Sequence, residues 1–331
     1  MVKLIIEKND GGQRLDRFLK KYLRNASLSH IYKLIRKDLK VNGKRAKVES
    51  VLEEGDELTF YISQEQFDEY IKVKKKPGAK AKKQFNVAYE DDRILIAEKP
   101  FGLLTHGDAK EKKNHLANQV AGYLQEKGEY DPARERVFAP SPVNRLDRNT
   151  TGLVIFGKDS EALQTLNRMI RDKGRIRKFY LTIALGEIKD EIHLSDKMEK
   201  DEATNTTKVL PADSETGKSM ETIIRPVQYN GKYTLVEVEI ITGRTHQIRA
   251  HLAKIGHPII GDSKYGNFRL NQNIKKQFNL TTQLLHAYKL VFNDMEEPFM
   301  YLQGKEITTA ALPKEFAGIK EKLFDKDRSK Q

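Results

Sequence analysis

The tetrapeptide Arg-Leu-Asp-Arg occurs twice among the residues that could do chemistry, at 14–17 and at 145–148. The first copy opens an amphipathic segment, so we place Asp16 in the first turn of a helix, where the helix dipole favours a carboxylate. The second copy precedes Asn-Thr-Thr-Gly and an apolar strand. Asp147 is therefore expected on a loop held by a rigid element, a common place for catalytic groups. On these residues alone, an ordinary loop ion pair is equally compatible.

A second group of polar residues lies in the segment Thr242-Gly-Arg-Thr-His-Gln-Ile-Arg249. The apolar spacing over 245–255 predicts a helix with Thr245 as its N-cap, ended by a glycine and a proline. Arg249 then lies in the first turn, where a guanidinium and the free N–H groups would hold a carboxylate in its charged form. The alternative is that Arg244 and Arg249 contact phosphates at the surface.

Tyr180 is the third candidate. It follows the cations of Arg-Ile-Arg-Lys at 175–178 and begins a strand-like run. An aromatic ring in a basic setting is a usual platform for stacking a nucleobase. A core aromatic whose hydroxyl reaches water is the alternative.

Several common chemistries have no motif in this chain. There is no GxxxxGK[ST] phosphate loop, no GxGxxG after a strand and no GxSxG nucleophile elbow. The chain has no cysteine, which excludes thiol catalysis and zinc–thiolate sites. The histidines at 246, 251 and 257 are spaced too irregularly to meet at one metal. We therefore expect neither a metal nor a cofactor.

The elements that must position these residues are predicted from apolar periodicity. Strands are expected at 94–97, 152–156 and 234–240, and a helix at 160–170. Many strands with interspersed helices indicate an α+β domain around a mixed or antiparallel sheet, running from 85 to 314.

A smaller unit is expected over 1–63, with a second helix capped by Ser29 that turns basic side chains outward. Residues 64–84 contain a lysine-rich stretch with Pro-Gly and are interpreted as a basic flexible linker. Residues 315–331 are interpreted as a charged C-terminal tail.

Composition points to a polyanionic partner. The 331 residues include 60 Lys+Arg against 47 Asp+Glu, a net charge of +13. No window has the roughly 20 apolar residues of a membrane span, and the N-terminal apolar run is too short for a signal peptide. We expect a cytoplasmic, monomeric protein without a membrane partner.

Together these motifs resemble the RluA-type pseudouridine synthases over nearly the whole chain, and the N-terminal unit resembles an S4 RNA-binding domain. The matching segments are 98–106, 144–153, 178–180, 243–249, 261–266 and 285–287. In place of the histidine that many members carry before Arg-Leu-Asp, this chain has Asn144, which hydrogen-bonds but carries no charge.

The resemblance implies a mechanism without a cofactor. A uridine is flipped out of the RNA and isomerised to pseudouridine. Tyr180 stacks on the uracil, and Arg148 fills the vacated space or holds the backbone. Asp147, paired with Arg249, starts cleavage of the N-glycosidic bond by attacking the sugar, attacking the base or removing a proton.

The resemblance also implies an RNA partner. An S4 domain joined to this catalytic domain resembles the branch that acts on large-subunit (23S) ribosomal RNA. The RNA-binding residues that we expect are Arg14, Lys33, Arg36, Lys37, Arg148 and Arg244.

Two functions of other classes are kept as alternatives. One is a non-catalytic RNA-binding protein of ribosome assembly, which release of tritium from C5-labelled uridine RNA would exclude. The other is a metal hydrolase built on the histidines, which metal analysis of the purified protein tests.

Overall fold

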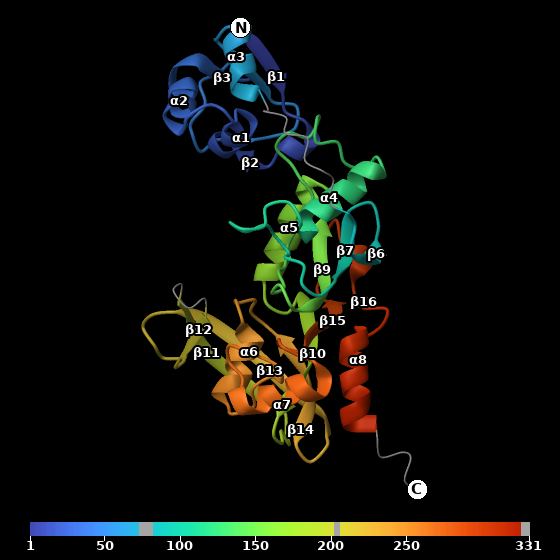
Figure 1. Cartoon of the computed structure of the whole chain (residues 1–331). Helices are drawn as coiled ribbons and strands as arrows, with labels where there is room; N and C mark the ends of the chain where they lie inside the picture. The colour runs from blue at the N-terminus through green and yellow to red at the C-terminus, as the bar shows by residue number, and fades with distance from the viewer. Residues whose placement is uncertain (73–81, 202–205, 326–331) are drawn as a thin grey trace. The chain divides into compact units, whose positions relative to one another are not determined.

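A computed structural model describes residues 1–72, 82–201 and 206–325 of the chain (Figure 1). The chain forms two compact units, each described here by itself. The first unit comprises Met1–Lys83, Ala117–Ser141 and Gly157–Leu166, and the second comprises Gln84–Leu116, Pro142–Phe156 and Asn167–Gln331.

Short elements build the first unit. Three strands pair antiparallel in the order β1-β5-β3, and β2 pairs with β4. Its elements within residues 1–72 are β1 (Val2–Ile5), η1 (Lys8–Asp10), β2 (Gln13–Arg14), α1 (Leu15–Tyr22), α2 (Leu28–Lys33), η2 (Leu34–Asp38), β3 (Leu39–Val41), β4 (Val51–Leu52), β5 (Glu57–Phe60) and α3 (Gln64–Ile71).

The helix expected at the first Arg-Leu-Asp-Arg copy is present as α1. It buries Leu15, Phe18 and Leu19 in the core of this unit. Asp16 lies in its first turn and forms an ion pair with Arg14 at 3.0 Å, which is a structural role. The cap of α2 differs from the expectation, because Ser27 rather than Ser29 accepts the hydrogen bond from the amide of His30.

The segment expected as a linker, 64–84, begins with the helix α3. Ser63 caps α3, and Phe67 packs into the core of the first unit against Phe60. The linker interpretation is therefore wrong for 64–71, because one apolar face with a serine cap is enough to order this helix. Residues 73–81 lie outside the described residues.

One large sheet dominates the second unit, as the mixed or antiparallel sheet of an α+β fold. Among the described residues eleven strands join it, with the central order β12-β11-β13-β14-β10-β15-β9-β7-β6, while β8 pairs with β9 and β16 with β15. The pair β9–β15 is parallel. The strands are β6 (Asn86–Glu90), β7 (Ile94–Lys99), β8 (Ser141–Pro142), β9 (Thr151–Gly157), β10 (Ile176–Leu185), β11 (Ile192–Asp201), β12 (Thr206–Leu210), β13 (Lys218–Tyr229), β14 (Tyr233–Ile240), β15 (Leu285–Phe292) and β16 (Glu306–Thr308).

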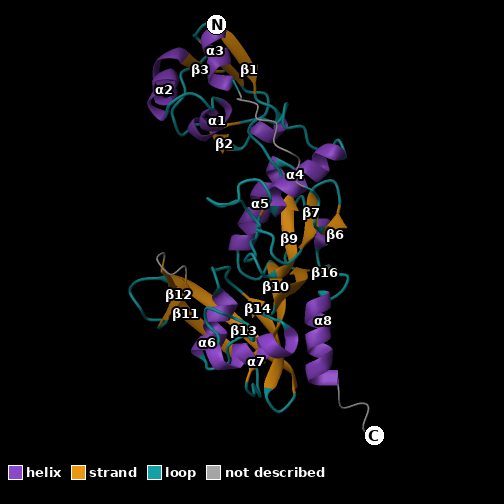
Figure 2. Ribbon diagram, viewed as in Figure 1, coloured by secondary structure: helices purple, strands orange, loops and turns teal. Residues whose placement is uncertain are grey.

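The helices α6, α7 and α8 pack on this sheet (Figure 2). The remaining helices and turns are α4 (Leu116–Glu126), α5 (Ser160–Arg171), α6 (Gln247–Lys254), α7 (Phe268–Phe278), η3 (Met300–Leu302), α8 (Lys314–Lys320) and η4 (Glu321–Asp325). None of the helices within the described ranges is long and apolar enough to cross a membrane.

The C-terminal segment is more ordered than expected. Phe316, Ile319 and Phe324 are buried in one cluster with Leu235 of β14 and Ile274 of α7. The interpretation of 315–331 as a tail is therefore wrong up to residue 325, because these three apolar side chains, spaced along one helical face, pack on the sheet. Residues 326–331 lie outside the described residues.

Close approach of two backbones fixes the start of β9. Gly152 has φ +115°, and a Cβ built on it would lie 2.0 Å from the carbonyl oxygen of Ala287 in β15. Only glycine fits this position, because a side chain would separate the parallel strands β9 and β15 directly after the Asp147 loop.

We predict that Gly152→Ala lowers the free energy of unfolding by more than about 3 kcal/mol. The energetic cost of a positive φ in alanine adds to that of the steric overlap between its Cβ and β15. Thermal unfolding should show this as a drop in Tm of roughly 6–12 °C. Gly318→Ala is the matched control, since Gly318 lies in α8 and a Cβ added there would meet nothing within 4 Å. An equal Tm for both variants would contradict the conclusion that only glycine fits position 152.

Candidate active site

Asp147 lies on the loop between β8 and β9, and Asn144 fixes the base of that loop. The side-chain Nδ2 of Asn144 donates to the carbonyl oxygen of Leu153 at 3.2 Å, and its Oδ1 accepts from the backbone amide of Ile155 at 2.8 Å. The amide of Thr150 donates to the carbonyl oxygen of Asp147 at 3.1 Å and closes the turn. Asn144 therefore has a structural role that needs no charge.

The neighbours of Asp147 on both sides are held by buried side chains. The hydroxyl of Thr105 donates to the carbonyl oxygen of Leu146 at 3.0 Å and accepts from its amide at 3.2 Å. The ammonium group of Lys99, 1% exposed, donates to the carbonyl oxygen of Arg148 at 3.0 Å. These contacts fix the backbone on either side of the carboxylate, so Asp147 itself has little freedom.

Lys99 also contacts the backbone of the loop that follows β7. It donates to the carbonyl oxygens of Pro100 at 3.1 Å and Leu103 at 2.8 Å, so all three of its protons have acceptors. Burial lowers the pKa of Lys99 to about 7, while the negative charge of Asp147 acts in the opposite direction. The three carbonyl oxygens stabilise the ammonium form.

The helix α6 is anchored through Gln247, which is 3% exposed. The Gln247 amide donates to the carbonyl oxygen of Glu221 at 2.7 Å and to the hydroxyl of Thr222 at 2.9 Å. Its oxygen accepts from the hydroxyl of Thr242 and from the amide of Arg244. The predicted helix is confirmed, but its N-cap is His246 and not Thr245.

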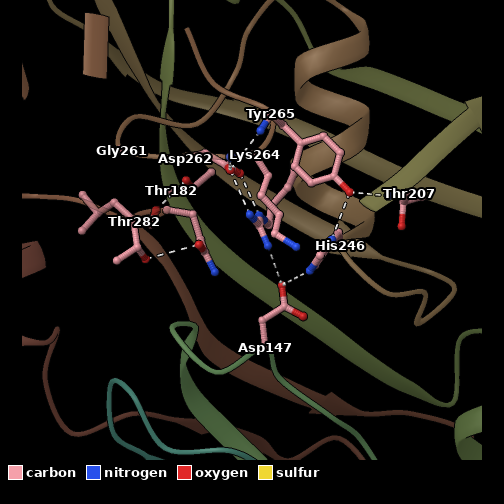
Figure 3. A network of polar contacts seen from close by, with 12 residues as sticks. Asp147, Thr182, Thr207, His246, Gly261, Asp262, Lys264, Tyr265 and Thr282 are labelled. Atoms are coloured by element: carbon pink, nitrogen blue, oxygen red, sulfur yellow. Dashed lines mark hydrogen bonds and ion pairs between the residues drawn. The ribbon is translucent and has the colours of Figure 1, made fainter. Parts of the chain in front are cut away.

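Arg249 connects Asp147 to a second carboxylate. Its Nε and Nη2 donate to the two oxygens of Asp262 at 2.7 and 2.8 Å, and its Nη1 donates to Oδ2 of Asp147 at 3.2 Å. Figure 3 shows this arrangement, with Asp147 on one side and Asp262 on the other. Because Arg249 is 4% exposed, this geometry is that of a buried three-group network rather than a surface phosphate contact.

The charge state of Asp262 follows from this pairing. Burial by itself would raise the pKa of Asp262, but its hydrogen bonds with Arg249 and the guanidinium charge outweigh burial. The backbone amides of Lys264 and Tyr265 also donate to Asp262, at 2.9 and 3.1 Å. The pKa of Asp262 is therefore lowered below its ordinary value of 3.8.

Tyr180 reaches the same place from β10. The register between β10 and β15 shifts between Phe179 and Tyr180, and such bulges redirect a side chain. Tyr180 is 5% exposed, and burial together with the charge of Asp147 raises the pKa of its hydroxyl. The phenol is therefore protonated at neutral pH.

A cavity of about 930 Å³ brings these groups together within the second unit. Asp147, Tyr180 and Arg249 all line it, as the sequence-based choice of these three residues requires. The volume is in the range of small-molecule pockets.

The predicted RNA-binding residues fall into two groups. Arg148 and Arg244 line the cavity, where Arg148 pairs with Asp108 at 3.6 Å and Arg244 donates to the carbonyl oxygen of Ser219 at 3.0 Å. The other group lies in the first unit, where a shallow groove is lined by exposed Lys33, Arg36 and Lys37 together with Ser29 and His30. Arg14 is paired with Asp16.

The three histidines considered as metal ligands contact different partners. His251 lies beside Thr222 and Asp196, and burial lowers its pKa to about 4. The ring of His257 contacts the carbonyl oxygen of Leu185, and that of His246 contacts Tyr265. Within the part of the chain that the structure describes, no three His, Cys, Asp or Glu side chains are placed to hold a metal ion.

Comparison with known proteins identifies the family. The RNA pseudouridylate synthase family matches residues 93–254. Ribosomal large subunit pseudouridine synthase C of Vibrio parahaemolyticus is 31% identical over 290 residues, which cover 87% of each chain. The protein of that name from Escherichia coli is 31% identical over 297 residues, 88% of each chain.

This chain belongs to the RNA pseudouridylate synthase family. It is also 32% identical to an uncharacterized RNA pseudouridine synthase of Mycoplasma capricolum, over 93% of this chain and 97% of that one. Among solved structures, human RNA pseudouridylate synthase domain containing 4 has a TM-score of 0.55 at 19% identity, covering 72% of this chain and 92% of that one, and so shares the fold.

The family assignment and the isomerase class predicted from the sequence are confirmed. Sequence reasoning assigned no catalytic or positioning role to six residues that hold the candidate site, although it noted the segments in which all of them lie. These residues are Lys99, Thr105, His246, Gln247, Asp262 and Tyr265. Polar side chains inside otherwise apolar surroundings, such as Lys99 at the end of β7, are the signal that could have indicated them.

We predict that Asp262→Asn lowers the free energy of unfolding by about 3–5 kcal/mol at pH 7, because it leaves the buried Arg249 without its two-point partner. It should also lower the rate of pseudouridine formation at saturating enzyme. Urea unfolding and single-turnover kinetics measure the two effects.

The pH dependence provides a second check on this pairing. Since the folded pKa of Asp262 is lowered, its stabilising contribution is present above pH 3.8 and is lost as the pH falls below that value. The stability difference between parent and Asp262→Asn should therefore shrink in acid. Asp172→Asn is the control, because Asp172 forms an exposed pair with Arg175; equal effects of the two substitutions would refute the role of Asp262.

Proposed function

We propose that this enzyme isomerises uridines of large-subunit ribosomal RNA to pseudouridine, with Asp147 as the catalytic carboxylate and no cofactor. The proposal rests on the different hydrogen bonding of the two Asp147 oxygens. Oδ2 accepts from Arg249 at 3.2 Å, whereas Oδ1 accepts no hydrogen bond from any described residue. One oxygen is thus held and the other is left to react, in a carboxylate that is 27% exposed and lines the cavity.

Arg249 and Tyr180 have complementary roles in this proposal. Arg249 orients Asp147 through a guanidinium that is itself fixed by Asp262. Tyr180 offers an aromatic surface to the uracil inside the same cavity. Arg148 and Arg244, at the cavity, contact the RNA backbone around the flipped nucleotide.

The ribosomal substrate is proposed from the relatives. Proteins named ribosomal large subunit pseudouridine synthase C match 87–88% of this chain. The net charge of +13 suits a large RNA, and a ribosomal substrate agrees with the cytoplasmic location and the monomer expected from the sequence.

The first unit supplies RNA affinity in this proposal, as an S4-like domain over 1–63. Its basic groove consists of cations on α2 and η2 that point outward, while Ile31, Leu34 and Ile35 are buried in the core. The proposed catalytic domain, expected over 85–314, extends to residue 325, because Phe316, Ile319 and Phe324 pack with Leu235 of β14. Phosphate contacts of this kind govern affinity and salt dependence more than the chemical step.

We predict that Asp147→Asn lowers the single-turnover rate at least about a thousandfold while folding and RNA affinity persist. Tritium release from C5-labelled uridine in ribosomal RNA fragments measures the rate, and filter binding measures affinity. Asp16→Asn, in the other Arg-Leu-Asp-Arg copy, is the matched control and should keep full activity. A parent enzyme that releases no tritium would overturn the proposed substrate, and an active Asp147→Asn would overturn the proposed carboxylate.

We predict that Lys33→Glu combined with Lys37→Glu weakens RNA binding and flattens its salt dependence by about 1.5 units of slope, since each phosphate contact contributes about 0.7–0.9. The single-turnover plateau should stay unchanged. Lys275→Glu with Lys276→Glu, on exposed positions of α7, is the control of equal charge change. If both pairs alter the salt slope equally, net charge and not the groove explains the binding.

A further inference from the structure

His246 has a backbone conformation that is uncommon for a residue other than glycine. It lies in the left-handed region at φ 55°, as the N-cap of α6, and its side chain caps no amide there. Residues other than glycine rarely adopt this conformation, although Asn, Asp and His do so more often than the rest. Such a conformation persists where the surroundings fix it. The position of the imidazole therefore calls for a reason beyond helix capping.

The imidazole is held by a chain of hydrogen bonds. The backbone amide of Thr207 donates to the hydroxyl oxygen of Tyr265 at 2.5 Å, and that oxygen lies 3.0 Å from Nδ1 of His246 (Figure 3). The hydroxyl of Thr207 also donates to the carbonyl oxygen of Thr245 at 2.9 Å. The strand β12 is thereby tied to the start of α6.

The hydrogen bonds along this chain favour one imidazole tautomer. The amide of Thr207 is only a donor, so the Tyr265 oxygen accepts from it and has its own proton to give. Nδ1 of His246 lies within reach and is unprotonated when it accepts this proton. In the neutral ring the proton is consequently on Nε2.

The Nε2 atom faces Asp147. It lies 3.8 Å from Oδ2, the same oxygen that accepts from Arg249. The opposite tautomer would direct a nitrogen lone pair at a carboxylate, which is repulsive. A distance of 3.8 Å is long for a hydrogen bond, and such contacts in substrate-free sites shorten when the substrate binds.

The surroundings favour the neutral ring. Burial lowers the pKa of His246, and the charges of Arg249 and Lys264 act in the same direction, against Asp147 and Asp262. Both the neutral Nε2–H form and the imidazolium direct a proton at Asp147. The contact between Nε2–H and Asp147 is therefore present in both protonation states of the ring.

We propose that His246 is a positioning residue for Asp147: Tyr265 and Thr207 fix its tautomer, and its Nε2–H joins Arg249 on Oδ2 so that Oδ1 stays free. This inference rests on the proposed role of Asp147. The alternative is that position 246 matters only for its backbone conformation.

Three substitutions separate the two roles. Gln places an amide where Nε2 was but tolerates a positive φ poorly, whereas Asn and Gly accept the positive φ and leave no donor that reaches Asp147. A positioning role predicts that His246→Gln keeps the single-turnover plateau within about threefold of the parent, while His246→Asn and His246→Gly lose about tenfold or more. A backbone role predicts the reverse order.

The loss should appear in the plateau rate and not in the enzyme concentration at half-saturation, because His246 acts through Asp147. Thermal unfolding of each variant shows whether it is folded, and the Asn and Gly variants are expected to be as stable as the parent. His193→Gln, which changes an exposed histidine paired with Glu191, is the control and should be fully active.

Nitrogen-15 NMR of the histidine-labelled parent tests the tautomer without an activity assay. The signals that disappear in His246→Gln should show a protonated Nε2 and an unprotonated Nδ1 at neutral pH. In Tyr265→Phe the donor to Nδ1 is lost, so the two tautomers should mix and the plateau rate should fall.

The outcomes distinguish this inference from the proposed role of Asp147. A protonated Nδ1 in the parent, or Asn and Gly variants that equal or exceed Gln in plateau rate, would overturn the role of His246. Full activity of Asp147→Asn, measured alongside, would overturn the role of the carboxylate itself.

Discussion

The guanidinium of Arg249 is buried, and a buried cation is stable only where carboxylates and hydrogen bonds replace its lost hydration. Asp262 supplies two of these hydrogen bonds and Asp147 a third. Asp262 is fully buried and is also held by two backbone amides, so it is the fixed end of the network. Asp147, partly exposed at the cavity, is the end that remains available for chemistry. The same charge balance that stabilises the fold thereby sets the orientation of the proposed catalytic group.

Segments far apart in the chain converge on this network. The loop that carries Asp147 is clamped by Lys99, at the end of β7, and by Thr105 in the segment that follows, and α6 is anchored to β13 through Gln247. The close parallel pair of β9 and β15 leaves room for glycine alone at position 152. Lys99, Thr105 and Gln247 are buried polar side chains with hydrogen-bond partners within the protein, which gives the site rigidity before substrate arrives.

The sequence predicted the parts of this site that depend on local pattern. Apolar periodicity located β7, β9, β14 and α6, and the context of each Arg-Leu-Asp-Arg copy separated Asp16 from Asp147. The family resemblance implied the pairing of Arg249 with Asp147, but nothing in the sequence indicated the second partner, Asp262, which is 13 residues away and in contact only through tertiary folding. Caps were displaced by one or two residues, and α3 and α8 were interpreted as linker and tail. Both helices are ordered by a few buried aromatic or aliphatic side chains. In a short, highly charged segment, these residues are too few to produce a clear apolar periodicity.

The proposed reaction depends on one carboxylate, Asp147, whose Oδ2 is held by Arg249 while Oδ1 is free to react. The most direct measurement is a crystal structure of the enzyme bound to a ribosomal RNA fragment with its target uridine. We expect the uridine flipped into the cavity beside Tyr180, with Oδ1 of Asp147 as the protein atom nearest the glycosidic carbon or the uracil ring and Oδ2 still paired with Arg249. If Arg249 instead bound a phosphate and no longer contacted Asp147, or if the uridine were bound away from Asp147, the structure would contradict the proposed role of Asp147.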